Sequence, residues 1–234
     1  MSLRLDQFIA NCTELSRKDA KRVIGAGTVT VDGAMCKSAN RKIPDGARVT
    51  LDGELLALPG DRYLMMNKPS GVVSATTDSE HPTALDLLPP GLARDLHIAG
   101  RLDLDTTGLL LLTTDGQWSH RVTSPRTDCP KTYRVTLGEP LTDTAKQALV
   151  TGVVLRNEDR ETRPATVRRV DDTVIELTIS EGRYHQVKRM LAAVGNHVKA
   201  LHRTRIGDIV LDPQLAPGEY RALTGQEIDS VSQG

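Results

Sequence analysis

The sequence contains few aromatic residues and little cysteine. Only 3% of its 234 residues are Phe, Trp or Tyr, so we expect a core of aliphatic side chains. The three cysteines, Cys12, Cys36 and Cys129, are far apart and form no CxxC pair. Their number and spacing argue against a disulfide framework and against a zinc site. The composition therefore predicts a protein of the reducing cytoplasm with no bound metal.

Long apolar runs and an excess of charge of one sign are also lacking. No stretch approaches the roughly 20 apolar residues that a membrane helix needs, and the first residues lack the apolar region of a signal peptide. Thirty Lys and Arg residues balance thirty Asp and Glu residues. Because 38% of the residues are hydrophobic, a packed core is expected and wholesale disorder is excluded. We therefore expect no contact with a membrane.

Local signals divide the chain near residue 58. Ser16 begins a capping pattern for a helix over 16–26, and glycines at 25 and 27 can end it. Strand patterns at 28–31 and 47–51 are each followed by an Asp-Gly turn. A Leu-Pro-Gly-Asp stretch at 58–61 has the composition of a linker. We expect one domain over residues 1–58 and a second over residues 59–234.

The second domain alternates short strands with short helices. Strand patterns fall at 63–66, 109–114, 132–137, 173–179 and 206–211. Helical patterns fall at 115–123, 142–149, 185–194 and 224–231. Because the order lacks regular βαβ units, it favours an α+β fold with a mixed, mainly antiparallel sheet.

Positive charge is concentrated in two regions, although the chain as a whole is neutral. Residues 16–48 contain eight basic residues against three acids, and residues 180–206 contain six against one. In the first region the pattern predicts either a solvated helix face or a phosphate-binding surface. No aromatic residue lies among these cations, so contact with a nucleic acid would be to its backbone or shape. The candidate RNA-binding residues are Arg17, Lys18, Lys21, Arg22, Lys37, Arg41 and Lys42.

The polar loop at 99–108 leads directly into four consecutive leucines. A buried strand of this kind can hold a catalytic side chain rigidly in the loop before it. The loop contains two carboxylates, Asp103 and Asp105. They could form a glycosidase-like pair, or Asp105 could cap a turn. Their spacing alone does not decide which aspartate is functional.

Four motifs resemble those of pseudouridine synthases that modify ribosomal RNA, and they occur in the family's order. G-R-L-D-L-D-T-T-G at 100–108 resembles the catalytic motif. N-K-P-S-G at 67–71, K-T-Y-R-V at 131–135 and E-G-R-Y-H-Q-V-K-R-M at 181–190 resemble the other three. The first domain is similar to the alpha-L RNA-binding domain of a ribosomal protein. The chain most resembles the ribosomal small-subunit pseudouridine synthase A family.

This resemblance implies a role for individual residues. Asp103 would be the catalytic aspartate, Tyr133 would pack against the flipped base, and Lys188 would pair with Asp103 and keep it ionised. Arg101 would help to hold the flipped strand. Helix geometry separately places Arg189 about 100° from Lys188, so Arg189 is expected at the surface or in contact with RNA. The expected substrate-binding residues are Asn67, Lys68, Arg101, Arg183, His185 and Gln186. For Asn67 and Lys68, structural or backbone contacts are the favoured alternative.

Without the resemblance, Tyr133 could equally be a core residue of a strand. His185 has no second metal ligand at i+4, where Arg189 stands, so metal binding is not expected there.

The chemistry expected of such an enzyme needs no cofactor. A carboxylate can act as nucleophile or as base, and the target base must leave its stack to be reached. Attack on the ribose, attack on the base and elimination all remain open. The expected partner is small-subunit ribosomal RNA, either naked or in a pre-assembled particle, bound by a monomer. The alternatives are a large-subunit RNA target, a non-catalytic ribosome-assembly factor and a glycosylase using both aspartates.

Overall fold

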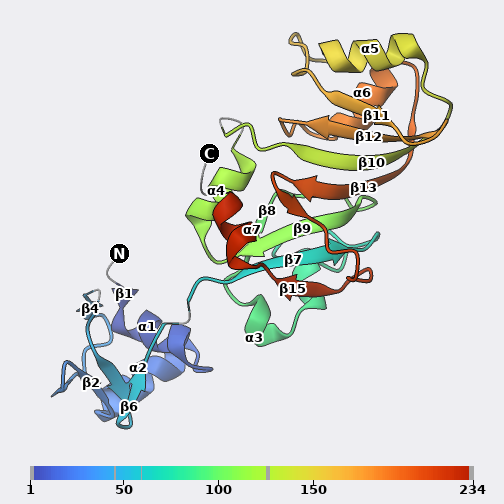
Figure 1. Ribbon diagram of the computed structural model, residues 1–234. Helices are drawn as coiled ribbons and strands as arrows, with labels where there is room; N and C mark the ends of the chain where they lie inside the picture. Colours follow the sequence, from blue (N-terminus) through green and yellow to red (C-terminus); the bar gives the residue numbers. More distant parts are fainter. Residues whose placement is uncertain (1–2, 45, 59, 125–126, 232–234) are drawn as a thin grey trace. The chain divides into compact units, whose positions relative to one another are not determined.

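A computed structural model describes residues 3–44, 46–58, 60–124 and 127–231 (Figure 1). The chain divides into two compact units, Met1–Gly60 and Asp61–Gly234. The division lies two residues after the boundary expected from the linker composition. Each unit has apolar clusters made only of its own residues.

The first unit combines two helices with short antiparallel strands. Helix α1 is Leu5–Cys12 and helix α2 is Arg17–Ala26. The strands are β1 Leu3–Arg4, β2 Val29–Val31, β3 Ala34–Met35, β4 Lys42–Ile43, β5 Val49–Leu51 and β6 Glu54–Leu56. They form a sheet of order β3-β2-β5-β6 and a separate β1-β4 pair. The sequence did not predict α1.

Local signals explain why α2 forms where it does. The hydroxyl of Ser16 accepts a hydrogen bond from the amide of Asp19, and Gly27 ends the helix in the left-handed conformation at φ 84°. Two Asp-Gly turns, at Asp32 and Asp52, connect the paired strands. Helix α2 and both hairpin turns therefore agree with the sequence pattern.

The second unit is built on one nine-stranded sheet. Its main path is β11-β12-β10-β13-β9-β7-β15, with β14 paired to β13 and β8 paired to β9. The strands are β7 Tyr63–Lys68, β8 His97–Ala99, β9 Thr107–Thr113, β10 Lys131–Leu137, β11 Thr166–Arg169, β12 Val174–Ile179, β13 Val198–Ile206, β14 Ile209–Val210 and β15 Tyr220–Ala222. All pairs are antiparallel except β9–β13. The sheet is therefore mixed and mainly antiparallel, as expected.

Helices cover both faces of this sheet. They are α3 Pro90–Ala93, α4 Gly116–Thr123, α5 Asp143–Thr151, α6 Gln186–Ala193 and α7 Gly225–Ser230, with a 3₁₀ turn η1 at Ala84–Leu87. Helices α5 and α6 lie beside β10, β11 and β12 (Figure 1). In the described part of the chain, no helix is long and apolar enough to cross a membrane.

The four-leucine strand β9 lies in the middle of the sheet and is buried on both faces. Leu109 and Leu111 pack into one apolar cluster with Trp118, while Leu110 and Leu112 pack into another on the opposite face. This double burial explains why the strand has no polar alternation. The loop that precedes β9 is consequently anchored to the most buried part of the unit.

Strands β9 and β13 approach each other closely because of a glycine. A Cβ on Gly108 would lie 2.3 Å from the carbonyl oxygen of Arg203, and Gly108 has φ 101°. Any other residue there would clash with the β13 backbone and would also be strained. The glycine of the loop motif thus permits the parallel pairing on which the site is built.

One predicted strand is wrong. The pattern at 206–211 was expected to be continuous, but β13 runs from Val198 to Ile206 and the chain then turns back into β14. Gly207 has φ 54°, a left-handed conformation that a strand does not contain. The apolar residues before and after this turn belong to two paired strands of a hairpin. Because both strands have a strand-like pattern, the sequence suggested a single strand.

Candidate active site

Asp103 lies in the loop between β8 and β9. The amide of Thr106 donates to the carbonyl of Asp103 at 3.1 Å, which closes a tight turn. The side chain of Asp103 is 31% exposed. It is therefore partly desolvated but still open to a ligand.

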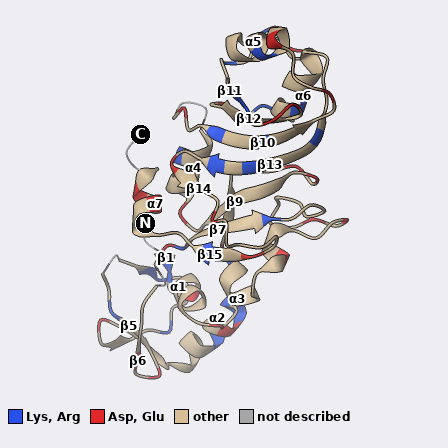
Figure 2. Cartoon of the chain, turned by 45° about the vertical axis from the view of Figure 1, so that its right-hand side comes forward, with Lys and Arg blue, Asp and Glu red and all other residues tan. Residues whose placement is uncertain are grey.

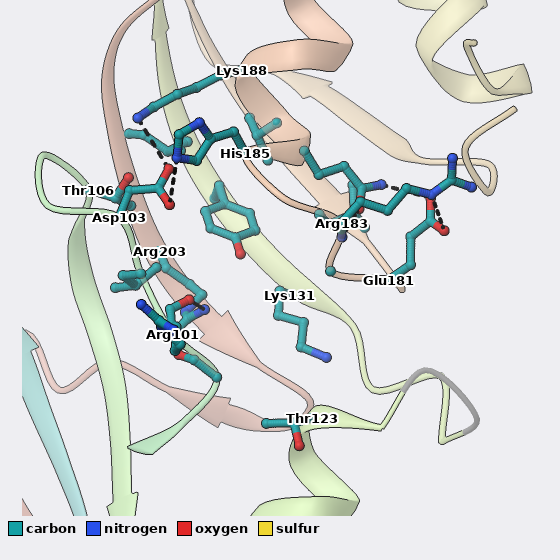
Figure 3. Close-up of a pocket in the computed structure, with 18 of the residues that line it drawn as sticks. Arg101, Asp103, Thr106, Thr123, Lys131, Glu181, Arg183, His185, Lys188 and Arg203 are labelled. Atoms are coloured by element: carbon teal, nitrogen blue, oxygen red, sulfur yellow. Dashed lines mark hydrogen bonds and ion pairs between the residues drawn. The ribbon is translucent and has the colours of Figure 1, made fainter. Parts of the chain in front are cut away.

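Two basic side chains from the α6 region meet this carboxylate (Figure 3). Lys188 Nζ lies 3.2 Å from Asp103 Oδ2, and His185 Nε2 lies 3.5 Å from Asp103 Oδ1. The same Lys188 ammonium lies closer to Asp105, at 2.7 Å from Oδ1. The expected pairing of Lys188 with Asp103 is present in the structure, but Lys188 is shared between two carboxylates.

The pKa values of Lys188 and Asp105 shift in the direction of a stable ion pair. Burial lowers the pKa of Lys188, but hydrogen bonds to Asp105 and Asp103 outweigh it, so its pKa is raised. The hydrogen bond from Lys188 lowers the pKa of Asp105, although burial opposes this. Because the lysine pKa rises and the aspartate pKa falls, the pair stays charged throughout the neutral range.

Arg203 of β13 makes hydrogen bonds to the backbone of the loop that contains Asp103. It is 2% exposed, and its guanidinium donates to the carbonyls of Leu109 at 2.9 Å, Gly100 at 2.6 Å and Arg101 at 3.4 Å. Two of these carbonyls belong to the loop that contains Asp103. The buried cation thus fixes the backbone that positions the carboxylate.

These residues surround a cavity of about 430 Å³. Tyr133, on β10, lines it together with Asp103, Lys188 and His185. The Tyr133 ring lies beside Arg203, whose guanidinium carbon is 6.0 Å from the ring centroid. A half-buried aromatic ring at the wall of a cavity of this size can pack against a planar base.

Basic side chains line the cavity from two neighbouring strands. They are Lys131 of β10 and Arg203 of β13, and further Lys and Arg residues are coloured blue along these strands in Figure 2. The exposed Arg101 also lines the cavity. Among the described residues, no ion-pair partner is seen for the Arg101 guanidinium. The cavity is therefore suited to a polyanionic ligand.

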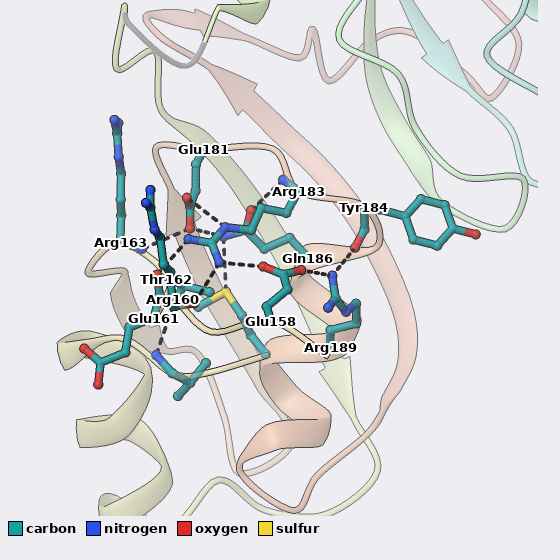
Figure 4. A network of polar contacts seen from close by, with 12 residues as sticks. Glu158, Arg160, Glu161, Thr162, Arg163, Glu181, Arg183, Tyr184, Gln186 and Arg189 are labelled. Carbon is teal, nitrogen blue, oxygen red and sulfur yellow. Dashed lines mark hydrogen bonds and ion pairs between the residues drawn. The ribbon is translucent and has the colours of Figure 1, made fainter. Parts of the chain in front are cut away.

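Arg183 and Gln186 line the cavity, but their polar groups mainly bind the protein itself (Figure 4). Arg183 pairs with Glu158 at 2.7 Å and Glu181 at 3.2 Å, and it also donates to the carbonyls of Arg160 and Glu161. Gln186 accepts from the Arg183 amide at 2.8 Å and donates to Glu181 at 2.8 Å. Both residues brace the loop before α6, and their contact with substrate stays a prediction.

The structure does not bring Asn67 or Lys68 to the cavity. Asn67 is 9% exposed and donates to the carbonyl of Leu215 at 2.8 Å. Lys68 is fully buried, and its Nζ donates to the carbonyls of Pro69 at 2.8 Å and Leu104 at 3.4 Å. Burial lowers the pKa of Lys68 to about 8, although Asp105 and Asp103 oppose the shift. Both side chains therefore make structural contacts to the backbone, and their contact with substrate stays a prediction.

All seven candidate RNA-binding residues of the first unit are exposed. Two of them have intramolecular partners: Arg17 bonds the buried Asp6 at 3.1 Å, and Arg22 bonds Asp19 at 2.9 Å. Their charges are consequently less available to a phosphate than the sequence suggested. Within the part of the chain that the structure describes, Lys18 and Lys21 are the exposed cations of α2 without such a pairing.

Two features of the site were missed in the sequence. Arg203 was counted only as part of a basic region, because the strand that contains it was not predicted. Arg189 was expected at the surface or on RNA, but it pairs with Glu158 at 2.6 Å. Each residue has a partner distant in the sequence, so no local signal could have identified its role.

A partly desolvated carboxylate between cations, facing an aromatic ring in an electropositive cavity, can perform cofactor-free chemistry on a nucleotide base. A family model described as RNA pseudouridylate synthase matches residues 62–193, and the chain belongs to this family. It is a pseudouridine synthase, an isomerase acting on RNA. The family, the fold class and the enzymatic activity predicted from the motifs are thereby confirmed.

Individual relatives resemble the chain over nearly its whole length. It is 55% identical over 230 residues to a protein of Escherichia coli (strain K12) named ribosomal small subunit pseudouridine synthase A, covering 98% of this chain and 100% of that protein. It is 49% identical over 231 residues to a protein of the same name from Vibrio parahaemolyticus, covering 98% and 99%. A crystal structure described as pseudouridylate synthase matches with a TM-score of 0.72 and 48% identity, covering 98% and 100%.

Replacing Lys188 by Met should lower single-turnover activity by up to about a hundredfold, and more than it lowers RNA affinity. Methionine keeps much of the side-chain length but removes the charge. Without the ammonium 3.2 Å away, Asp103 loses the charged hydrogen bond that orients its carboxylate in the cavity. Single-turnover rates and direct RNA binding, measured on the same preparation, check the two effects.

Two variants serve as controls for Lys188→Met. One keeps the positive charge at residue 188, and the other removes the charge of a different lysine. Lys188→Arg should keep more activity than Lys188→Met. Lys199→Met changes an exposed lysine that donates to the carbonyl of Gly138 at 3.3 Å, and it should leave turnover unchanged. Wild-type turnover in Lys188→Met would instead favour Arg101 or His185 as the partner of Asp103.

Proposed function

We propose that the chain converts a uridine of small-subunit ribosomal RNA into pseudouridine, with Asp103 as the catalytic carboxylate. The main support is the position of Asp103, whose carboxylate lies in an electropositive cavity 3.2 Å from the Lys188 ammonium. The names of the full-length relatives support the choice of RNA. Because this RNA is the substrate, the protein would act in the cytoplasm.

The reaction is an isomerisation, and each residue of the site has a part in it. The bond between N1 of the base and C1′ of the ribose breaks, the base turns, and a bond forms between C5 and C1′. C5 loses a proton and N1 gains one, so atoms and charge balance. Asp103 acts as nucleophile or base, Lys188 holds its carboxylate at 3.2 Å, and Tyr133 packs against the flipped uracil.

Pseudouridine mapping tests this function. Small-subunit ribosomal RNA from cells that lack the protein should lose one or more pseudouridines, and the purified protein should restore them without changing the RNA mass. Release of free uracil would instead indicate a glycosylase. Loss of a pseudouridine from large-subunit RNA alone would contradict the choice of substrate.

We infer further that the protein acts as a monomer, and that its substrate is small-subunit ribosomal RNA, either naked or in a pre-assembled particle. Sedimentation of the free protein tests whether it is a monomer. Comparing turnover on naked RNA, on an assembly intermediate and on the complete subunit tests which form of the RNA is the substrate.

The first unit is proposed to be an alpha-L RNA-binding domain that binds the phosphate backbone. Removing residues 1–60 should weaken RNA binding and make it less dependent on salt. The slope of the logarithm of the binding constant against the logarithm of salt concentration should become shallower by about 0.7 to 0.9 for each phosphate that is no longer neutralised. The remaining unit should fold, because its apolar clusters contain none of the removed residues. Affinity measured from low to high salt checks this.

A charge variant separates binding to phosphate from removal of the whole unit. Lys18→Gln combined with Lys21→Gln removes two exposed cations of α2 and should reproduce part of the change in slope. If the truncated and charge-changed proteins both keep the wild-type affinity and slope, the basic face is only a solvated surface.

A further inference from the structure

Tyr184 is an aromatic residue in an unusual position. Of the six aromatic residues, Phe8 and Trp118 are buried, whereas Tyr63, Tyr133 and Tyr220 are half-buried. The remaining one, Tyr184, is 77% exposed. Hydrophobic packing in the free protein does not account for this placement.

The exposed ring lies directly beside the catalytic cavity. It stacks on the ring of His185, with the centroids 3.7 Å apart and the planes 23° from parallel. His185 lines the cavity, and its Nε2 is 3.5 Å from the Asp103 carboxylate. One face of the tyrosine is therefore covered by the histidine. The other face can receive a third planar group in the same stack.

The backbone that presents Tyr184 is firmly held. Arg189 donates to the carbonyl of Tyr184 at 3.2 Å and pairs with Glu158, which in turn pairs with Arg183 (Figure 4). The Tyr184 ring points away from this network. An aromatic ring held outward by a braced loop loses little conformational freedom when a ligand binds.

The surroundings favour a nucleic-acid base as that ligand. Surfaces that bind single-stranded RNA combine cations for the backbone with aromatic rings on which bases stack. Here Arg101, Lys188 and His185 line the cavity next to the exposed ring. The target uridine must reach Asp103, and His185 lies between Asp103 and Tyr184. A base on the open face of Tyr184 therefore belongs to another nucleotide.

We propose that Tyr184 is a stacking platform for the base of a nucleotide flanking the target uridine, and that it helps to select the RNA sequence or shape around that uridine. This inference rests on the proposed action on small-subunit ribosomal RNA. It assigns Tyr184 to binding rather than to chemistry. Tyr184 should thus influence KM and RNA affinity more than the rate of the bound complex.

A double-mutant cycle between the side chain and the RNA tests the stack directly. The probe is a fragment of small-subunit ribosomal RNA that contains the uridine modified by the wild-type protein, bound to full-length protein with Asp103→Asn so that it does not react. Adding Tyr184→Leu should weaken binding between about fivefold and a hundredfold. Tyr184→Phe should recover most of the affinity because it keeps the ring.

Abasic substitutions in the RNA identify the stacked nucleotide. At one position next to the target, removing the base should weaken binding to the Tyr184 protein but have little further effect on the Tyr184→Leu protein. Val210→Ala removes another exposed apolar side chain, 53% exposed and outside the cavity lining, and should show no such coupling. In the active protein, Tyr184→Leu should raise KM and leave single-turnover rates at saturation nearly unchanged.

The outcomes separate this inference from the proposed function. If the wild-type protein modifies the RNA but Tyr184→Leu binds it equally well, or no abasic position couples to Tyr184, the stacking inference is wrong. It is also wrong if Tyr184→Leu loses affinity only for a particle containing proteins, since the ring would then contact protein. If the wild-type protein forms pseudouridine neither in this RNA nor in a particle that contains it, the proposed function itself fails.

Discussion

Replacing Asp103 by Asn should abolish pseudouridine formation, by about a thousandfold or more, while RNA binding survives. Asparagine has nearly the same shape and can still accept a hydrogen bond from Lys188, so the loop and the cavity should persist. It lacks the negative charge and the lone-pair basicity that a nucleophile or general base requires. Single-turnover formation of pseudouridine and direct RNA binding, measured on the same preparations, check the two halves of this expectation.

Asp105→Asn is the matched control, since both aspartates contact the same ammonium. Asp105 lies closer to Lys188, at 2.7 Å, but its side chain is 68% exposed compared with 31% for Asp103. The more exposed carboxylate is less suited to chemistry that must exclude water. Asp105→Asn should therefore retain activity within about tenfold of the wild type, as expected for an exposed ion pair that contributes little. An inactive Asp105 variant beside an active Asp103 variant would reverse the assignment.

Replacing Arg203 by Met should reduce both stability and turnover. Methionine fills part of the volume but removes the guanidinium that donates to the buried carbonyl of Leu109 and the partly buried carbonyl of Gly100. We expect the free energy of unfolding to fall by about 2 to 4 kcal/mol. In the protein that remains folded, turnover should fall by about a hundredfold, because a shift of the Asp103 loop by about 1 Å is sufficient for that. Denaturant unfolding and single-turnover assays at low temperature measure the two effects.

Arg205 provides the control for Arg203. It lies two residues further along β13 but is exposed, and it pairs with Asp208 at 2.8 Å. Arg205→Met should change the free energy of unfolding by about 0.5 kcal/mol or less. If Arg203→Met were as stable and as active as Arg205→Met, the guanidinium would not be what fixes the loop.

The sequence by itself determined the elements whose signals are local. Ser16, Asp115, Thr142 and Thr224 each cap the helix that follows them, as their hydroxyl or carboxylate side chains predict. The leucines of β9 predicted a buried strand, and the motif at 100–108 placed a carboxylate in the loop before it. These signals are strong because each depends on hydrogen bonds or burial within a few residues.

The tertiary structure alone decided which side chains meet. Lys188 contacts Asp105 across 83 residues of sequence, and Arg203 reaches the carbonyl of Gly100 across 103. Resemblance to a family suggested the pairing of Lys188 with Asp103, but not its sharing with Asp105. Nor did the sequence indicate the buried position of Arg203 or the exposure of Tyr184. These contacts depend on the register of β9 against β13 and on how α6 and its preceding loop pack beside the sheet. Such long-range geometry is set by the packing of the whole unit, so no local pattern of residues can specify it.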